Sequence, residues 1–300
     1  MKRKVIKQGN QAYTITLPIE WVRQHKIDKK SEVDMIESGK SLVVNSDNPI
    51  SGGSVTIDLE GLNDKAIYRI INSLYAKGID EIIVKSKKDI SKPLLRAGSN
   101  NLGFALVSQD KDGYIIRDIS GANYTSLDEI FKRVFQMILF FYDSAIEDIF
   151  GKEEETQESL TARDLEVNKF CLYLQRAINK MSYQDSINGR ILFTYSFELE
   201  KIGDEIMRLW RTNIKYDVRK SKKLEEFAGL IKKTLEETFD SYYQFNLKRI
   251  EVVHIIRDKI REESMSLATS HANTMRFIRH LVKIAEECAD LSHLTLMRKL

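Results

Sequence analysis

The chain has few cysteines and no long apolar run. Cys171 and Cys288 are its only two cysteines in 300 residues, and each lies inside an apolar helical repeat. Their setting predicts reduced, buried thiols in a cytoplasmic protein rather than a disulfide framework. No stretch of about 18 uncharged apolar residues occurs, and no apolar segment follows the basic start at residues 1–4. We therefore expect neither secretion nor membrane insertion.

Proline and glycine are scarce in the second half of the chain. All three prolines precede residue 94, and only four of the 14 glycines lie beyond residue 121. The first half alternates short β-branched runs with turn signals, whereas the second half is a continuous helical pattern. The predicted fold is therefore multidomain α+β. Its expected domains are a swapped-hairpin β domain at 1–48, a small α/β module at 54–121, and all-α three-helix bundles at 125–217 and 220–300.

Residues 45–53 have the polar, turn-forming composition of a linker. Beyond them we predict a strand at 54–59, a helix at 63–77 that Asn63 caps and Gly78 ends, and a strand at 81–85. Runs at 102–107 and 114–119 flank the turn 110–113, so a hairpin completes the module. No catalytic constellation appears in this module.

Six helical segments follow, with apolar residues three and four positions apart. We expect the segments to form two sets of three. Within these sets, breaks at 151–159, 186–189, 240–243 and 262–266 separate one helix from the next. The predicted segments are 130–149, 160–181, 195–209, 224–239, 245–260 and 275–296. Their length favours elongated antiparallel bundles over a compact globin-like packing.

Positive charge is concentrated at one end. The net charge is only +3, but residues 1–30 hold eight Lys or Arg against two acids, a local net charge of +6. The rest of the chain is mildly acidic. This distribution favours contact with a phosphate backbone by the N-terminal end alone.

The run from Lys4 to Val22 has the order basic strand, glycine turn, β-branched strand, Leu-Pro, helix. It resembles the swapped-hairpin domain of the AbrB, MazE and SpoVT superfamily, with segments 31–36 and 41–44 as the closing hairpin. Ser31-Glu32 stands where the family often has Gly-Asp. The resemblance implies a homodimer that binds DNA, and a hairpin this short independently needs a second copy to complete a core.

Two copies of the basic side chains would line one face together with amide side chains that hydrogen-bond phosphates or base edges. The predicted DNA-binding residues are Arg3, Lys4, Lys7, Gln8, Asn10, Gln11 and Arg23. Solvated surface charges are the alternative, because some copies of this domain only dimerise.

The third helical segment carries Leu199-Glu200-Lys201-Ile202-Gly203-Asp204. It is similar to the PhoU family signature Leu-Glu-Arg-Ile-Gly-Asp, and the run 163–169 is similar to a second family motif, with Asn168 where an aspartate is usual. The family has two tandem three-helix bundles and regulates phosphate uptake. In the second repeat, Val282 replaces the signature glutamate.

Carboxylates four residues apart share a helical face, so their oxygens can hold a hard cation or bridge two metals. The PhoU resemblance implies iron, zinc or another divalent metal on such faces. The candidate ligands are Asp164, Glu200 and Asp204, and separately His254, Asp258, Glu286 and Asp290. Solvated acidic faces without a metal are the alternative.

The leading interpretation is a cytoplasmic, non-enzymatic transcriptional regulator of phosphate homeostasis, resembling archaeal chains that fuse these two modules. The alternative is a signalling adaptor that binds a phosphate ABC transporter or a sensor kinase and uses its N-terminal domain only to dimerise. A metal-dependent phosphohydrolase lacks support, because no P-loop, activated nucleophile or His-rich two-metal constellation appears in the sequence.

Overall fold

The computed structural model describes residues 2–9, 12–38, 41–45, 53–111, 113–121, 127–151, 156–180, 186–267 and 271–300. The chain divides into two compact units, Met1–Ser51 and Gly52–Leu300. Within these described ranges, no helix combines the length and the apolar character that crossing a bilayer requires.

The N-terminal unit contains two antiparallel hairpins and a short helix. β1 (Ile6–Gln8) pairs with β2 (Ala12–Thr14), α1 spans Ile19–Gln24, and β3 (Asp34–Ser38) pairs with β4 (Ser41–Asn45). The closing hairpin begins later than residue 31. The Ser31 amide donates to the Asp28 carbonyl, and the Lys30 amide donates to Asp28 Oδ1, so this segment forms a turn.

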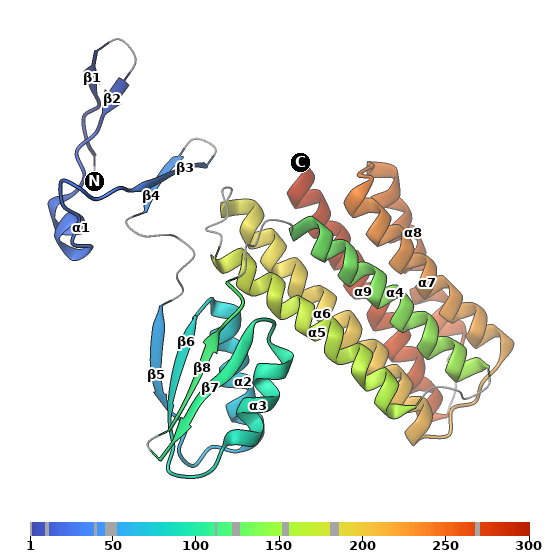
Figure 1. Cartoon of the computed structure of the whole chain (residues 1–300). Helices are drawn as coiled ribbons and strands as arrows, with labels where there is room; N and C mark the ends of the chain where they lie inside the picture. Colours follow the sequence, from blue (N-terminus) through green and yellow to red (C-terminus); the bar gives the residue numbers. More distant parts are fainter. Residues whose placement is uncertain are drawn as a thin grey trace. The chain divides into compact units, whose positions relative to one another are not determined.

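The α/β module contains four strands and two helices, β5 (Ser54–Asp58), α2 (Asp64–Lys77), β6 (Glu81–Lys85), α3 (Ser91–Asn100), β7 (Phe104–Asp110) and β8 (Gly113–Asp118). The sheet order is β5-β6-β8-β7, and only the β5–β6 pair is parallel. Both helices lie on one side of the sheet (Figure 1). Their apolar faces meet buried side chains of β6 and β8 in one cluster.

Local sequence explains the limits of α2 and the β7–β8 turn. Asn63 Oδ1 accepts from the Ala66 amide at 3.0 Å, and Gly78 ends α2 in the left-handed region at φ 99°. At Gly113, an added Cβ would lie 2.1 Å from the Val84 carbonyl oxygen. A side chain at position 113 would therefore push β8 away from β6.

Helix α3 has no counterpart among the predicted elements. Pro93 discourages a helix prediction, yet it occupies the third position of α3. The amides of a helix's first turn have no acceptor inside the helix, so a proline there removes no hydrogen bond. Burial of Leu94 and Ala97 against the sheet stabilises the helix.

Six long helices form the rest of the chain as the sequence predicts. They are α4 (Leu127–Phe150), α5 (Gln157–Lys180), α6 (Ser186–Lys215), α7 (Lys222–Tyr243), α8 (Leu247–Ser266) and α9 (Ala272–Lys299). Three predicted breaks were wrong, because residues 186–189, 240–243 and 262–266 lie inside helices. At the end of α7, burial of Tyr242 against Phe135 keeps the chain helical until residue 243.

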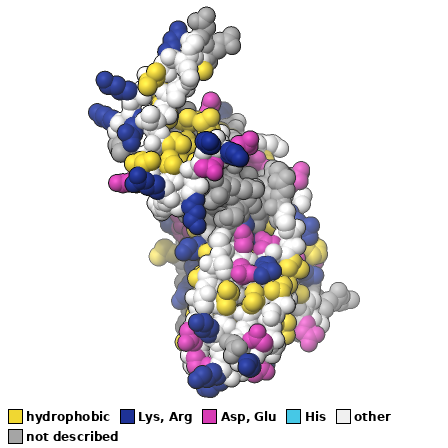
Figure 2. Space-filling view, turned by 60° about the vertical axis from the view of Figure 1, so that its left-hand side comes forward, with side chains coloured by type: hydrophobic (Ala, Val, Ile, Leu, Met, Phe, Trp, Pro, Cys, Tyr) yellow, Lys and Arg dark blue, Asp and Glu magenta, His cyan; other side chains and the backbone are white. Residues whose placement is uncertain are grey.

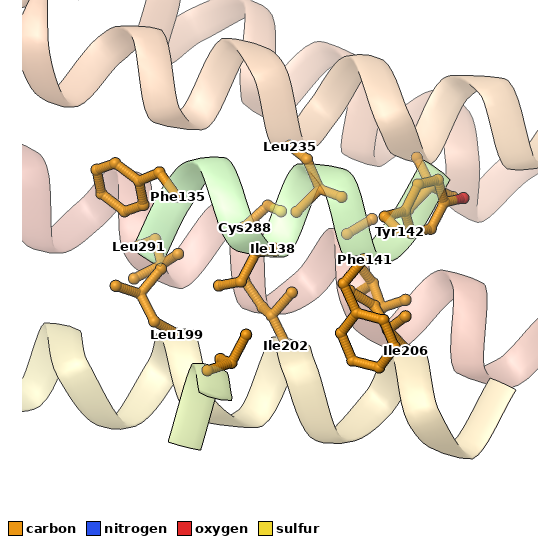
Figure 3. Close-up of a cluster of buried hydrophobic side chains, with 14 of the residues drawn as sticks. Phe135, Ile138, Phe141, Tyr142, Leu199, Ile202, Ile206, Leu235, Cys288 and Leu291 are labelled. Carbon is orange, nitrogen blue, oxygen red and sulfur yellow. The ribbon is translucent and has the colours of Figure 1, made fainter. Parts of the chain in front are cut away.

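The two sets of three helices share one hydrophobic core. Side chains from α4, α6, α7 and α9 meet in a single cluster, in which Phe141, Ile202, Leu235 and Cys288 are fully buried or nearly so (Figure 3). The expected bundles therefore pack against each other through their apolar faces. Cys171 and Cys288 are both buried free thiols, as predicted.

One buried acid joins α6 to α9. Glu205, on α6, accepts from His280 Nδ1 at 2.7 Å and from Lys283 Nζ at 2.8 Å, and it also pairs with Arg208. Burial alone would raise the pKa of Glu205, but these hydrogen bonds and charges lower it to about 2. The carboxylate therefore remains ionised across the physiological range and links the two sets of helices.

A buried arginine joins the α/β module to α5. Arg176 is inaccessible to solvent and donates to the carbonyls of Tyr75 at 3.0 Å and Ile79 at 2.7 Å. Its other terminal nitrogen lies 2.5 Å from Asp80 Oδ1 and 2.7 Å from Asp118 Oδ2. Since the acceptors come from the module and the donor from the bundle, this residue fixes how α2 and the sheet pack on α5.

Candidate functional site

The N-terminal unit presents uncompensated positive charge. Arg3, Lys4, Lys7 and Arg23 are exposed, and none of them forms an ion pair within the described residues. Gln8, at the end of β1, is exposed and accepts from the Thr14 hydroxyl at 2.7 Å. Asn10 and Gln11, predicted for the same face, lie outside the described residues. The unit thus offers cationic donors of the kind that contact phosphates.

The same unit buries none of the side chains whose burial is described in residues 2–45, and the helix α1 has no buried residue. Val5, Ile6, Tyr13 and Met35 are 58 to 70% exposed. Figure 2 shows yellow apolar side chains beside dark-blue Lys and Arg side chains over this unit. An apolar surface this open on so small a unit calls for a covering partner.

The first predicted carboxylate set lies on two adjacent helices. Asp164 is on α5, whereas Glu200 and Asp204 are on α6. Burial, reinforced by the charges of Asp204 and Asp164, raises the pKa of Glu200 to about 7. Burial and the charge of Asp204 raise the pKa of Asp164 to about 6. The charges of these acids oppose one another's ionisation, but among the described residues their oxygens do not form a group that lies within 4.8 Å.

Two oxygen atoms at this site have no hydrogen-bond donor in the part of the chain that the structure describes. They are Asp164 Oδ1 and Asn168 Oδ1, which are buried and lie one helical turn apart on α5. Asn168, which replaces the usual aspartate, therefore still offers an oxygen. On the other side, Arg208 pairs with Asp204 at 2.5 Å. Buried acceptors without donors are unfavourable, and a bound cation would satisfy them.

The second predicted set is not assembled. Arg261 binds Glu286 through two bonds of 2.6 and 2.7 Å and also lies 3.6 Å from Asp258. His254 Nε2 is 3.3 Å from the Ser292 hydroxyl, and burial together with Arg257 lowers its pKa. An arginine thus supplies the positive charge for two of the predicted ligands.

Asp290, the fourth member of that set, lies near two other acids. Its oxygen and those of Glu198 and Glu287 lie within 4.8 Å of one another. Burial and the hydrogen bond with Glu198 raise the pKa of Glu287 to about 7. Glu198 and Glu287 were not predicted, because contact between α6 and α9 is not visible in the spacing along either helix.

Comparison with known proteins gives two findings. The chain is similar to the crystal structure of the phosphate transport system regulatory protein PhoU from Streptococcus pneumoniae, with a TM-score of 0.49 and 13% sequence identity. The similarity covers 58% of this chain and 93% of that chain. No curated protein matches the chain.

The second finding concerns the N-terminal unit. Residues 6–50 match the family model described as antidote-toxin recognition MazE, bacterial antitoxin. The match includes both hairpins and α1. The predicted MazE-like N-terminal domain is thereby confirmed.

Proposed function

We propose that the chain is a DNA-binding transcriptional regulator of phosphate homeostasis that acts as a homodimer. The observation that carries the proposal is the N-terminal unit, in which the four predicted basic side chains form no ion pair among the described residues and accompany exposed apolar side chains. A second copy covering the apolar surface would bring two basic sets onto one assembly. Paired sets of this kind suit two half-sites on a duplex.

The six-helix part is then the sensory or partner-binding part of the regulator. The PhoU-like signature at 199–204 lies on α6, where Glu200 and Asp204 face Asp164 of α5. That resemblance links the chain to phosphate uptake. A phosphate transporter or sensor kinase is the partner that it suggests, and the regulator itself performs no catalysis.

Selection of bound fragments from a random DNA pool, followed by titration at several salt concentrations, tests the proposal. We expect a specific site whose log affinity falls linearly with log salt, by a slope of about 0.9 for each phosphate contacted. The double variant Lys4→Glu/Lys7→Glu should lose binding. Lys29→Glu/Lys30→Glu, in the same unit, makes an identical change in net charge and should retain more of it.

Two outcomes would contradict the proposal that the chain is a DNA-binding regulator. If no sequence is enriched and affinity is absent even at low salt, the chain is an adaptor whose N-terminal unit only dimerises. If both double variants lose affinity equally, the predicted face is not the contact surface.

We also propose that the carboxylates of α5 and α6 hold a divalent metal such as iron or zinc. The unpartnered oxygens of Asp164 and Asn168 support this assignment. Elemental analysis of protein purified without chelators should find metal in the wild type and in Asp258→Asn, but not in Asp204→Ala. Absence of metal from all three proteins would refute the assignment.

A further inference from the structure

A groove of about 680 Å³ lies between the α/β module and the helices. One wall is α2, the opposite wall is α6, and α5 lies between them. This volume is within the range of small-molecule sites, which combine apolar surface with a few convergent polar groups. The groove uses none of the N-terminal residues assigned to DNA, but Glu200, a predicted metal ligand, is among its lining residues.

The α2 wall carries positive charge. Arg69 and Lys77 line the groove two helical turns apart, with Ser73 between them, and all three are exposed. No acid pairs with either cation among the described residues. Their spacing leaves both free to approach one anionic group of a ligand, and arginine binds phosphate oxygens through paired N–H donors.

The α5 side contributes a buried donor without an acceptor. Gln175 is only 1% exposed and lines the groove, and its Nε2 has no hydrogen-bond partner among the described residues. A buried amide that lacks a partner has a free-energy cost. A ligand with an acceptor at this depth would remove that cost. The unpartnered amide is thus an observation independent of the surface charge.

The α6 wall is aromatic. Phe193 and Phe197 line the groove with their rings edge to face, 5.3 Å between centroids. Phe197 is 42% exposed, so its ring is accessible to a ligand in the groove. Tyr68 of α2 also lines the groove. Flat ring surfaces facing a cavity favour a planar, apolar ligand group.

We propose that this groove binds a nucleoside monophosphate. Arg69 and Lys77 hold the phosphate, the phenylalanine rings pack against the base, and Gln175 Nε2 donates to an acceptor on the base edge. Inorganic phosphate would use only the cations, and a nucleoside would use only the rings and the amide. The assigned ligand is the class that uses all three features together.

Calorimetric titration of the full chain tests the proposal with AMP, GMP, CMP and UMP. We expect at least one of these to bind at least tenfold tighter than either inorganic phosphate or the matching nucleoside. Arg69→Glu/Lys77→Glu and Gln175→Leu should each weaken that binding at least tenfold. The control Lys65→Glu/Lys92→Glu makes the same charge change on α2 and α3 outside the groove, and it should leave binding unchanged.

Thermal unfolding of each variant verifies that the fold is retained, and Phe197→Ala provides a second probe if Gln175→Leu fails to fold. The proposal is overturned if none of the four nucleotides binds at millimolar concentration. It is also overturned if a nucleotide binds no tighter than phosphate alone, or if the groove variants and the control behave alike. Because DNA is absent from this titration, its outcome is independent of DNA binding.

Discussion

The pKa of Glu200 differs between the folded and the unfolded chain. It is half-buried on α6 beside Asp164 and Asp204, and burial raises its pKa to about 7. The folded protein therefore keeps the Glu200 proton between its ordinary pKa and about pH 7, whereas the unfolded chain releases it. This stabilisation is complete below the ordinary pKa and is lost as pH rises through 7.

We predict that Glu200→Gln flattens this pH dependence. The variant should match the wild type near pH 4 and exceed its free energy of unfolding by about 1–2 kcal/mol at pH 8, because a neutral amide cannot ionise. Urea unfolding of metal-free protein at several pH values measures the difference. Glu129→Gln, an exposed change at the start of α4, should follow the wild type. Parallel profiles for Glu200→Gln and wild type would contradict the prediction.

At the residue scale, spacing predicted partners along one helix but not across helices. Glu200 and Asp204 are four residues apart, and their association with Asp164 follows the predicted neighbouring helices. Arg261 is a partner that the spacing did not predict. Its bidentate contact with Glu286 joins α8 to α9, and no local pattern in either helix marks that arginine as the partner.

At the element scale, the contact between α2 and α5 depends on the buried guanidinium of Arg176. Arg176 replaces the water of its guanidinium with two carbonyls and two carboxylates, so its removal takes one donor from each of these four acceptors. Asp80 would still pair with Lys180, and Asp118, whose side chain is 10% exposed, would still accept from Ser120.

We predict that Arg176→Met lowers the free energy of unfolding by about 3–5 kcal/mol, the usual effect of breaking a buried ion pair. Hydrogen exchange should also accelerate in α2, because the module loses its attachment to α5. Arg117→Met breaks an exposed pair with Glu81 and should cost less than about 1 kcal/mol. Equal losses in the two variants would show that Arg176 contributes no more than a surface charge.

The helices were predictable as elements, whereas several of their ends were not. Apolar spacing identified all six long helices, but Ser186 to Gly189 resemble a break and are the first turn of α6. Helix α3 was missed because Pro93 suppresses the helical signal, although a proline in the first turn is compatible with a helix. Burial of Leu94 and Ala97 decided the case of α3, and burial depends on partners distant in the sequence.

At the scale of the whole molecule, the proposed dimerisation rests on an N-terminal unit in which none of the side chains with a described burial is buried. We predict that Ile6→Asp/Tyr13→Asp converts the full chain from dimer to monomer and weakens specific DNA binding, because a monomer presents one basic set instead of two. Sedimentation measures the mass. Val107→Asp, at a 44% exposed position of the α/β module, is the control and should remain dimeric. A monomeric wild type would refute the prediction.

The order of domains was predictable at this scale because hairpin, mixed and helical segments have different periodicities. How the helical sets combine was not, since apolar spacing shows which face of a helix is buried but not what covers it. The shared core around Phe141, Ile202 and Leu235 is a property of all six helices together.

The groove has one further consequence, because the α/β module forms one of its walls and the long helices form the others. α2 is attached to the helices through Arg176, so the groove is complete only while that attachment holds. A ligand that contacts both walls therefore stabilises the attachment of α2 while it is bound. Thermodynamic coupling between two equilibria is reciprocal. If the bound ligand makes detachment of α2 less favourable by some factor, then any change that detaches α2 lowers the ligand affinity by the same factor. The mobility of the α/β module would then depend on whether a ligand is bound in the groove.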